Sequence, residues 1–544
     1  MTQTASLSPL PALSVAQVRQ HLLDRREIAL LDLREEDPYA QAHPLWAANL
    51  PLSRVELEAW RRIPRRDTLI VLYGEHEGED LVPRGAAVLA RLGYTNLHAL
   101  EGGLEGWRRA GGELFRDVNV PSKSFGELVE HERHTPSLAA EEVKALLDAQ
   151  ADVVVLDARR FDEYQTMSIP GATSVPGAEL VLRARALAPD AATRVIVNCA
   201  GRTRSIIGTQ SLVNAGLPNP VAALRNGTIG WLLAGQQLEH GAQRRAPPDV
   251  DPAVREQARA DAQAVAARAG VRTLALADLP ALLGEAGRTT YRLDVRTPEE
   301  YEAGHLPGFA SAPGGQLVQE TDHHAPVRGA RFVLADDDGV RAAMTGSWLA
   351  QMGWEVWRIE GAAPTDFSET GTPAPERPAP HRDVEPIAPA ALAALLEAGD
   401  AVLIDVGASA NYVRRHIPGA WFAVRAQLAT ALARSLPAAS QYVLTCGTSL
   451  LAAHAAADLR ALLDAQGRTD LPVRLLTGGN AAWFAAGLPE EAGEARLATP
   501  RTDRYRRPYE GTDAPREAMQ GYLDWEFGLV AQLSRDGTHH FRVI

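Results

Sequence analysis

A fourfold internal repeat is the feature that most constrains how this 544-residue chain can fold. Four short apolar runs each end in an aspartate, and in the first three an arginine follows two residues later. The aspartates are Asp32, Asp157, Asp294 and Asp405, and the arginines are Arg34, Arg159 and Arg296. Such runs, bounded by polar residues, are typical of buried strands in a parallel sheet. Because the chain is also too long for one hydrophobic core, the repeat predicts four small domains in tandem.

The second half of each repeat contains another apolar run at a nearly constant distance. By subtraction it ends 41 or 42 residues after the aspartate, at Tyr73, Cys199, Ala335 and Cys446. A helix-like stretch follows each run, and three repeats close on a glycine-rich turn and a tryptophan. We therefore expect an α/β fold in which each domain has a small, mostly parallel sheet flanked by helices. We treat the four positions that end these runs as equivalent.

The predicted domains are separated where proline and polar residues cluster. We expect domains at residues 1–118, 119–245, 246–370 and 371–500, followed by a C-terminal tail at 501–544. The clearest linker runs from Thr370 to Arg382 and contains four prolines. The tail belongs to no repeat, and its stretch from Arg516 to Leu533 is predicted to be partly helical.

Composition excludes several classes of function. The net charge of −13, from 55 basic and 68 acidic residues, disfavours a nucleic-acid partner. Two cysteines cannot form a disulfide framework for a chain of this length. Met1 to Val15 lacks the pattern of a secretory signal, no apolar run is long enough to cross a bilayer, and the histidine pairs lack metal-ligand spacing. We therefore expect a cytoplasmic protein with no membrane partner, no metal and no cofactor.

In the second repeat a cysteine stands where a buried strand ends and a helix begins. Cys199 lies at the carboxyl end of this run, which is where open α/β sheets bind ligands. The loop after it consists of Ala200, Gly201, Arg202, Thr203, Arg204 and Ser205. We expect its backbone N–H groups to surround the sulfur as an anion-binding nest, with Arg202 and Arg204 holding the pKa of Cys199 below the ~8.5 of a free cysteine. The alternative is an inert, buried thiol.

These motifs resemble those of the rhodanese, or thiosulfate sulfurtransferase, family. The resemblance covers Ser14 to Leu497 as four rhodanese-like domains, and it rests on the Asp-x-Arg strand end, the Pro-Gly-Ala turn, the cysteine-headed loop and the closing Gly-x-x-x-Trp pattern. It implies a persulfide on Cys199, substrate-anion binding by Arg202 and Arg204, and a cradle made by the amides of the loop. The Asp-x-Arg pair matches positions that are mainly structural in the family.

The equivalent positions in the other repeats predict that domain 2 alone has a fully competent site. Tyr73 and Ala335 cannot form a persulfide, so the first and third domains are predicted to be inactive. Cys446 makes the fourth domain either a candidate second site or a degenerate one, because its loop holds no arginine or lysine to bind an anion.

The predicted reaction is a double displacement. Thiosulfate, or a similar small anionic donor, gives its outer sulfur to Cys199, and cyanide, a small thiol or a protein acceptor then takes it. A protein phosphatase is disfavoured because its longer Cys-x5-Arg loop needs an arginine at Ser205. A non-enzymatic persulfide carrier or sensor that hands sulfur to a protein partner stays open as the alternative. The physiological donor, the acceptor and the neighbour that completes the pocket are left open.

Overall fold

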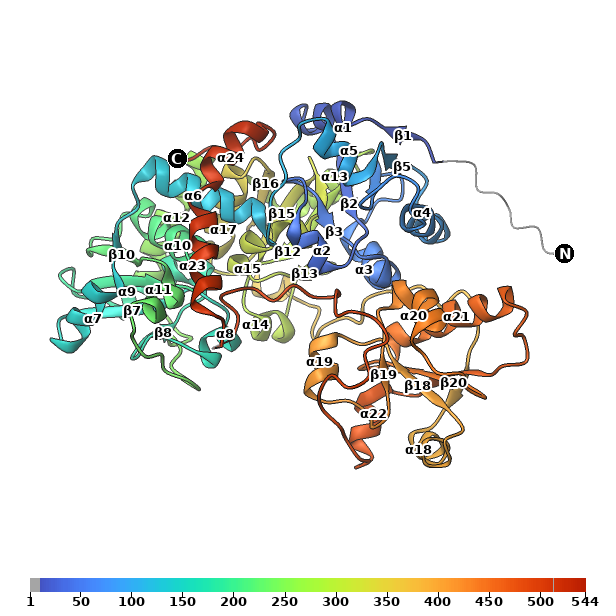
Figure 1. Ribbon diagram of the computed structural model, residues 1–544. Helices are drawn as coiled ribbons and strands as arrows, with labels where there is room; N and C mark the ends of the chain where they lie inside the picture. The colour runs from blue at the N-terminus through green and yellow to red at the C-terminus, as the bar shows by residue number, and fades with distance from the viewer. Residues whose placement is uncertain (1–9, 512) are drawn as a thin grey trace.

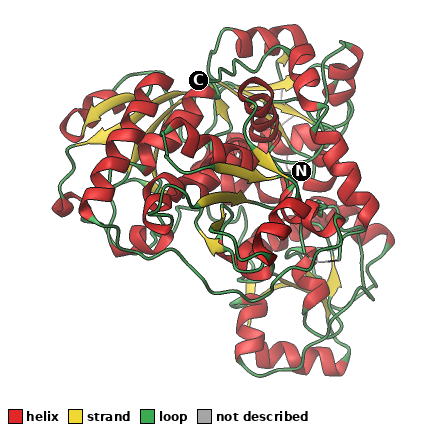
Figure 2. Ribbon diagram, turned by 90° about the vertical axis from the view of Figure 1, so that its left-hand side faces the viewer, coloured by secondary structure: helices red, strands yellow, loops and turns green. Residues whose placement is uncertain are grey.

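The computed structural model describes residues 10–511 and 513–544 (Figure 1). Residues 1–9, most of the stretch predicted to lack a secretory signal, lie outside the described residues. The chain forms four sheets, one for each repeat, covered by helices (Figure 2). The predicted α/β fold with four mostly parallel sheets is therefore confirmed, and we call these units domains 1 to 4. Within the described residues, no helix combines the length and apolarity needed to cross a membrane.

All four sheets share one strand order. Counted within each domain, neighbouring strands follow the order first, fifth, fourth, second, third. In domain 1 the strands are β1 (Ala12–Leu13), β2 (Ile28–Asp32), β3 (Ala48–Asn49), β4 (Ile70–Tyr73) and β5 (Leu97–Leu100), and the helices are α1 (Val15–Leu23), α2 (Glu36–Gln41), α3 (Val55–Arg62), α4 (Leu81–Arg91) and α5 (Gly103–Arg109). In domain 2 the strands are β6 (Ser137–Leu138), β7 (Val153–Asp157), β8 (Thr173–Ser174), β9 (Arg194–Asn198) and β10 (Val221–Leu224), and the helices are α6 (Val120–Arg133), α7 (Ala140–Asp148), α8 (Phe161–Thr166), α9 (Leu180–Leu187), α10 (Thr203–Asn214) and α11 (Gly227–Leu233).

Domains 3 and 4 repeat this pattern. In domain 3 the strands are β11 (Arg272–Ala275), β12 (Thr290–Asp294), β13 (Ala310–Ser311), β15 (Arg331–Ala335) and β16 (Glu355–Glu360), and the helices are α12 (Pro252–Ala269), α13 (Leu279–Leu283), α14 (Pro298–Ala303), α15 (Gly314–Gln319), α16 (Thr321–His324) and α17 (Arg341–Gln351). In domain 4 the strands are β17 (Glu385–Ile387), β18 (Val402–Asp405), β19 (Trp421–Phe422), β20 (Tyr442–Thr445) and β21 (Val473–Leu476), and the helices are α18 (Pro389–Ala398), α19 (Ser409–Arg414), α20 (Leu428–Arg434), α21 (Leu450–Ala465) and α22 (Gly479–Ala485).

The strand register shows which residues are equivalent in the four domains. The aspartate that ends each second strand pairs with the last residue of the fourth strand, which is Tyr73, Asn198, Ala335 and Thr445 in turn. Cys199 and Cys446 each come one residue later, so their equivalents in domains 1 and 3 are Gly74 and Asp336. The prediction that Tyr73 and Ala335 occupy the nucleophile position is therefore wrong by one residue. The segment between the second and fourth strands is one residue shorter in domain 4 than in the other domains. The distance from the aspartate to Cys446 therefore equals the distance to Tyr73 or Ala335, although Cys446 lies one residue after its strand.

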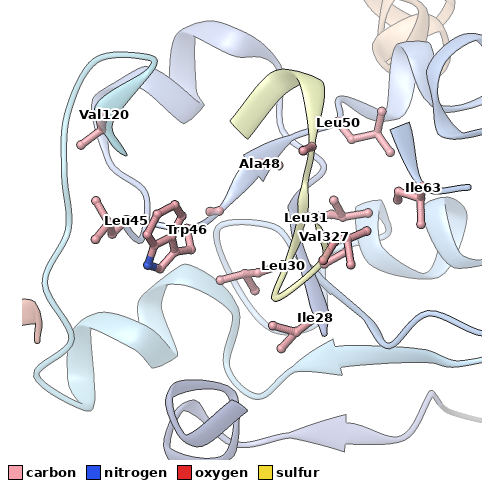
Figure 3. Close-up of a cluster of buried hydrophobic side chains, with 14 of the residues drawn as sticks. Ile28, Leu30, Leu31, Leu45, Trp46, Ala48, Leu50, Ile63, Val120 and Val327 are labelled. Carbon is pink, nitrogen blue, oxygen red and sulfur yellow. The ribbon is translucent and has the colours of Figure 1, made fainter. Parts of the chain in front are cut away.

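Domains 1 and 3 share one hydrophobic core. The short strand β14 (Val327–Arg328) leaves domain 3 and pairs antiparallel with β2, with Val327 opposite Ala29. Figure 3 shows Val327 among labelled side chains of β2, including Leu31. Phe332 of β15 belongs to the same buried cluster, whereas domain 4 has buried clusters of its own. Ile206 and Ile207 of α10 lie in the same cluster, so domains 1, 2 and 3 form one packed unit, and domain 4 is a separate one.

The C-terminal tail runs back from domain 4 across the other domains. Its helices α23 (Arg516–Glu526) and α24 (Leu529–Asp536) lie against α6 (Figure 1), and α23 also contacts α11. Leu529 and Leu533 of α24 are buried in the core that domains 1 and 3 share. The prediction of a partly helical tail is confirmed, and its position brings the end of the chain next to the loop that begins at Cys199.

Candidate active site

Backbone hydrogen bonds from α11 hold the loop that begins at Cys199. The carbonyl of Cys199 accepts from the N–H of Thr228 at 2.9 Å, and the carbonyl of Ala200 accepts from that of Ile229 at 3.0 Å. Gly227 begins α11 with a φ of 55°, and a Cβ there would lie 2.3 Å from the Cys199 carbonyl oxygen. Only glycine fits this approach. The closing glycine of the repeat therefore sets the position of the loop.

The loop combines a buried thiol with buried backbone donors that have no partner. Ala200, Gly201 and Arg202 are buried, and their N–H groups meet no acceptor anywhere in residues 10–511 and 513–544. Such orphaned groups are rare because each costs about as much as a lost hydrogen bond. The Cys199 thiol donates to the Ser205 hydroxyl at 3.4 Å. Free donors gathered in one loop beside a sulfur atom are suited to holding a negative charge.

The pKa of the thiol moves in the opposite direction from the prediction. Cys199 is 2% exposed, and burial raises the pKa of its thiol. The charge of Arg204 opposes this shift, as do hydrogen bonds from Ser205 and the more distant charge of Arg159. The prediction of a lowered pKa is therefore wrong for this arrangement, because loss of contact with water outweighs the nearby positive charge.

Arg204 is tied to a carboxylate. It donates two hydrogen bonds of 2.8 Å to Glu163 of α8, and although burial opposes ionisation, Arg204 lowers the pKa of Glu163 to about 2. Domain 3 has the same pair at equivalent positions, where Arg341 donates to Glu300 at 2.6 Å. Because domain 3 has no cysteine in the described structure, the presence of the pair does not by itself mark an active domain. An anion that approaches Cys199 must compete with Glu163 for Arg204.

Arg202 does not face the site of a substrate anion, where the motif predicts it. Its guanidinium donates to both carboxylate oxygens of Glu127, at 2.7 and 2.8 Å, and also to Glu130 and, at 3.1 Å, to Asn226. It stacks on Phe527 at 4.3 Å. These contacts use the donors of the guanidinium, so the prediction that Arg202 binds a substrate anion does not agree with its placement. Arg202 instead attaches the loop to α6.

The Asp-x-Arg pair of β7 is hydrogen-bonded to the residue that precedes the Cys199 loop. Arg159 donates to both oxygens of Asp157, at 2.9 and 2.7 Å, and both side chains are buried. Asn198, the residue before the cysteine, donates to Asp157 at 2.9 Å. The pair therefore joins β7 to β9, in agreement with the structural role expected for it.

In domains 1 and 3 a carboxyl group occupies the place of the sulfur. Asp336 accepts from the N–H of Ala342 at 2.8 Å, and burial, with help from the neighbouring Asp338, raises the pKa of Asp336. In domain 1 a Cβ on Gly74 would lie 2.6 Å from a carboxylate oxygen of Glu79. Both loops are thus filled by an acidic side chain of the chain itself.

The loop of domain 4 keeps the cysteine but not the enclosure. Cys446 accepts from the N–H of Ala452 at 3.4 Å, and its carbonyl accepts from α22 as that of Cys199 does from α11. Gly447 and Thr448 are exposed, and so is Leu450, at 41%. No arginine or lysine is within this loop.

The tail covers the loop of domain 2. Tyr522 of α23 lies 3.1 Å from the position that a Cβ on Gly201 would take, and Glu526 lies 3.6 Å from it. Tyr522 packs in a small apolar cluster with Ile229 of α11. Lys123 of α6, paired with Asp117, lies 5.0 Å from the centre of the Tyr522 ring. A helix from the far end of the chain therefore closes one side of the site.

A cavity of about 560 Å³ lies on the side of the site where Arg204 and Glu163 meet. Its walls come from α8 of domain 2, from the end of α15 in domain 3 and from the tail. From outside domain 2 it is lined by Gln316, Gln319, Glu320, Arg504, Arg507, Tyr509 and Glu510, among others. Cys199 is not a lining residue, so Arg204, which lines the cavity and acts on the thiol, connects the two. Domain 3 and the tail are the neighbours that complete the pocket.

The loop at Cys199 follows from local sequence, but the residues that reach it from domain 3 and the tail do not. Gln319, Arg507 and Tyr509 carry no local motif, because tertiary contacts alone bring them to domain 2. The group of arginines between Arg501 and Arg507 was a signal that could have pointed to an anion site. Among the described residues, no group of three or more His, Cys, Asp or Glu side chains is arranged to hold a metal ion.

The family comparison agrees with this architecture. The rhodanese-like domain family matches the chain four times, at residues 14–110, 139–234, 276–363 and 388–486, which together make up more than half of it. The chain belongs to the rhodanese family. Each match begins at the residue after the first strand of one sheet and covers the other four strands of that domain, so one match falls on each of the four rhodanese domains. No curated protein is similar enough to count as a match.

Two solved structures illustrate the range of similarity to this rhodanese chain. The crystal structure of a thiosulfate sulfurtransferase from Pseudomonas aeruginosa has 65% sequence identity and a TM-score of 0.95, and the alignment covers 98% of this chain and 100% of that one. A variant of EanB in complex with ergothioneine has 16% identity and a TM-score of 0.24, with 67% of this chain and 100% of that chain covered.

Proposed function

We propose that this chain is a thiosulfate sulfurtransferase that works through a persulfide on Cys199. The Cys199 thiolate attacks the outer sulfur of thiosulfate, and a bond forms between the two sulfur atoms. The sulfur–sulfur bond of thiosulfate breaks, and its electron pair leaves with sulfite. An acceptor then removes the outer sulfur and restores the thiolate.

The observation that carries this proposal is the set of buried, unpartnered amides of Ala200, Gly201 and Arg202 in the loop of a buried cysteine. They suit the negative charge of the outer persulfide sulfur, which needs several donors and little space. The full-length similarity to a protein named as a thiosulfate sulfurtransferase, at 65% identity, supports the same donor. Thr203, Arg204 and Ser205 complete the cradle in this proposal, with Arg204 as the charge that draws the donor in.

The raised pKa of Cys199 adds a requirement to the first step. The thiol must lose its proton before attack, so persulfide formation is expected to speed up with rising pH until the thiol is ionised. The location in the cytoplasm, and cyanide, a small thiol or a protein as acceptor, stay predictions.

The test compares the effects of replacing each of the two cysteines. After incubation with thiosulfate, wild-type protein is expected to gain one sulfur, measured by intact mass and located on Cys199 by peptide mapping. Cys199→Ser is expected to abolish both this gain and turnover, whereas Cys446→Ser is expected to keep most of both. Loss of activity in Cys446→Ser alone would show that the site lies in domain 4.

A further inference from the structure

Domains 2 and 3 face each other through the same segment of their common fold. In domain 2 this segment is the 3₁₀ turn η2 (Gly177–Glu179), and in domain 3 it is the start of α15. The two segments meet, because a Cβ on Gly315 would lie 3.1 Å from the backbone nitrogen of Gly177. The turn η2 also contacts α17 of domain 3, and α15 lines a cavity together with α10 of domain 2. Each segment therefore lies beside the helix that follows the fourth strand of the neighbouring domain.

On the domain 3 side of this interface, an arginine is surrounded by carboxylates. Carboxylate oxygens of Glu179, Glu300, Asp337 and Asp338 lie 3.0, 2.6, 2.8 and 2.7 Å from guanidinium nitrogens of Arg341. Of these four, Glu179 comes from domain 2, and both it and Arg341 are buried. The carboxylates outweigh the charge of the guanidinium and occupy its donors, so Arg341 is not available to an anion.

Arg204, the equivalent of Arg341 in domain 2, has one carboxylate partner instead of four. That partner is Glu163, and no other carboxylate forms an ion pair with Arg204 in residues 10–511 and 513–544. The two loop positions that hold aspartates in domain 3 are Ala200 and Gly201 here. Arg204 and Glu163 together are therefore neutral, and any further carboxylate would make the group negative.

The carboxylate that crosses the interface is replaced by the amide of Gln316. Gln316 and Glu179 occupy the same place in their domains, since by subtraction each lies 22 residues after the aspartate that ends the second strand. Gln316 is half-buried and lines the cavity that Arg204 also lines. The pair of Glu179 with Arg341 shows that a glutamate at this place reaches the arginine of the neighbouring domain.

We propose that Gln316 of domain 3 is a specificity-determining residue of the domain 2 site, because its neutral side chain leaves Arg204 able to attract an anionic donor. This rests on the proposed function. Gln316→Glu would bring a second carboxylate to Arg204, and the group would then repel thiosulfate and favour the protonated form of Cys199. Domain 3, whose own loop is filled by Asp336, thus sets the charge of its neighbour's site.

The other charged and titratable groups near Arg204 form a constant background. Arg159 and Tyr509 act on it electrostatically, and Glu320 lies at the end of α15. Burial raises the pKa of Tyr509 and that of Glu320, which favours the uncharged form of both. None of these groups is altered by a substitution at Gln316.

The first experiment changes the charge of this side chain and, separately, its chemistry. In Gln316→Glu, the thiosulfate concentration that half-saturates sulfite release in a single turnover is expected to rise about tenfold, and release should reach its full rate at higher pH. Gln316→Met has nearly the same length without charge or amide and should keep the wild-type behaviour. Gln237→Glu adds the same charge at an exposed position that does not line the cavity, and should change neither quantity. No change in Gln316→Glu, or an equal change in either control, would refute the proposal.

The second experiment assigns the effect to Arg204. The double variant Glu163→Gln/Gln316→Glu again gives Arg204 a single carboxylate, so it is expected to recover most of the affinity and the pH profile that Gln316→Glu loses. If it recovered neither, the added carboxylate would not act through Arg204, and the proposal would fail.

A third measurement separates this inference from the proposed function. In a Cys446→Ser background, the pH dependence of Cys199 alkylation by iodoacetamide reports the thiolate without any thiosulfate. The profile is expected to move to higher pH in Gln316→Glu and to stay in place in Gln316→Met. Coincident profiles would overturn the inference even if the wild-type protein gains sulfur from thiosulfate. If the wild-type protein gains no sulfur, the proposed function fails, and the alkylation profiles still decide whether Gln316 sets the charge at the thiol.

Discussion

The reactivity of the Cys199 sulfur depends on a balance between burial, which raises the pKa of the thiol, and the nearby charges and hydrogen bonds that lower it, chiefly the charge of Arg204. Burial raises the pKa of the thiol, and Arg204 opposes it while being bound to Glu163. The same arginine–glutamate pair in domain 3, Arg341 with Glu300, shows that the pair is not itself a sign of activity. What distinguishes domain 2 at this scale is a thiol whose neighbouring amides are both unpartnered and buried, whereas Gly447 and Thr448 beside Cys446 are exposed.

Removing the carboxylate that binds Arg204 is expected to activate the thiol. In Glu163→Gln the charge of Arg204 is no longer neutralised, so the pKa of Cys199 should fall and sulfite release should reach its full rate at lower pH. The pH dependence of sulfite release in a single turnover measures this. Glu300→Gln, which breaks the equivalent pair in domain 3, is the control and should leave the profile in place. Coincident profiles for Glu163→Gln and wild type would contradict the role given to Arg204.

Glu526 makes stability depend on pH. Burial, with the charge of Glu127, raises its pKa from 4.5 to about 8, so between these pH values the folded protein binds more protons than the unfolded chain. The free energy of unfolding therefore falls as pH rises through this window, and the loss is complete above it. Glu526→Gln should be more stable than wild type at pH 9, by on the order of 1 kcal/mol, and equal to it near pH 4. Urea unfolding measures the difference.

The control for this measurement lies on the same helix. Glu517 is exposed on α23, so Glu517→Gln should match wild type at both pH values. If Glu526→Gln gained nothing at pH 9, ionisation of Glu526 would not be what weakens the fold there.

Helix α23 covers the Cys199 loop, although the two are more than 300 residues apart in the sequence. It packs Tyr522 against Gly201 and joins α11 through a shared apolar cluster. The loop of Cys446 has no such cover, since Gly447 and Thr448 are exposed. The difference between the two cysteine loops is therefore as much a matter of which helix lies over them as of their own residues.

Loosening α23 is expected to expose Cys199. Tyr522→Ala removes a ring whose loss costs about 3–5 kcal/mol at a well-packed site, so the helix should detach more often. Alkylation of Cys199 by iodoacetamide should become about tenfold faster, with Cys446 in the same sample as an internal reference. Tyr522→Phe keeps the ring and should stay near the wild-type rate. No acceleration in Tyr522→Ala would mean that α23 does not control access.

The sequence predicts those parts of the fold that depend on local patterns repeated in each domain. The strands ending at Asp32, Asp157, Asp294 and Asp405, and the loop at Cys199, follow from runs and spacings that lie close together in sequence. The register of Tyr73 and Ala335 was missed by one residue because a single deletion in domain 4 is invisible without the strand pairs. The partners of Arg202, the burial of Cys199 and the approach of Arg507 depend on tertiary contacts, which no local pattern encodes.

At the scale of the whole molecule, domains that are not consecutive in the sequence pack against one another. Domain 3 contributes β14 to the sheet of domain 1 and its α15 to the cavity of domain 2. Domain 4 is joined to domain 1 by a buried ion pair in which Arg425 meets both oxygens of Glu56, at 2.7 and 2.8 Å. The segment 371–384 is mostly exposed and has no helix or strand.

We expect that cleavage of the chain within the segment 371–384 leaves the two fragments associated. A glutamate-specific protease should cleave after Glu376, because exposed segments without regular structure are preferred sites. The two fragments should separate on a denaturing gel but elute together, at the volume of the intact protein, in native size-exclusion chromatography. The contacts of the tail with α6 and the Arg425–Glu56 pair provide the reason. Separate elution would show that these contacts do not hold the halves together.

The position of the tail has a consequence for how the protein is made. The ribosome releases the second domain long before Arg504, Arg507 and Tyr522 have been synthesised, and domains fold in the order in which they emerge. A nascent chain with a complete domain 2 thus carries its thiol in a half-built site, open to oxidants. The active site is complete only after α23 has been synthesised, and a stop codon before Arg504 removes a wall of the active site rather than an appendage.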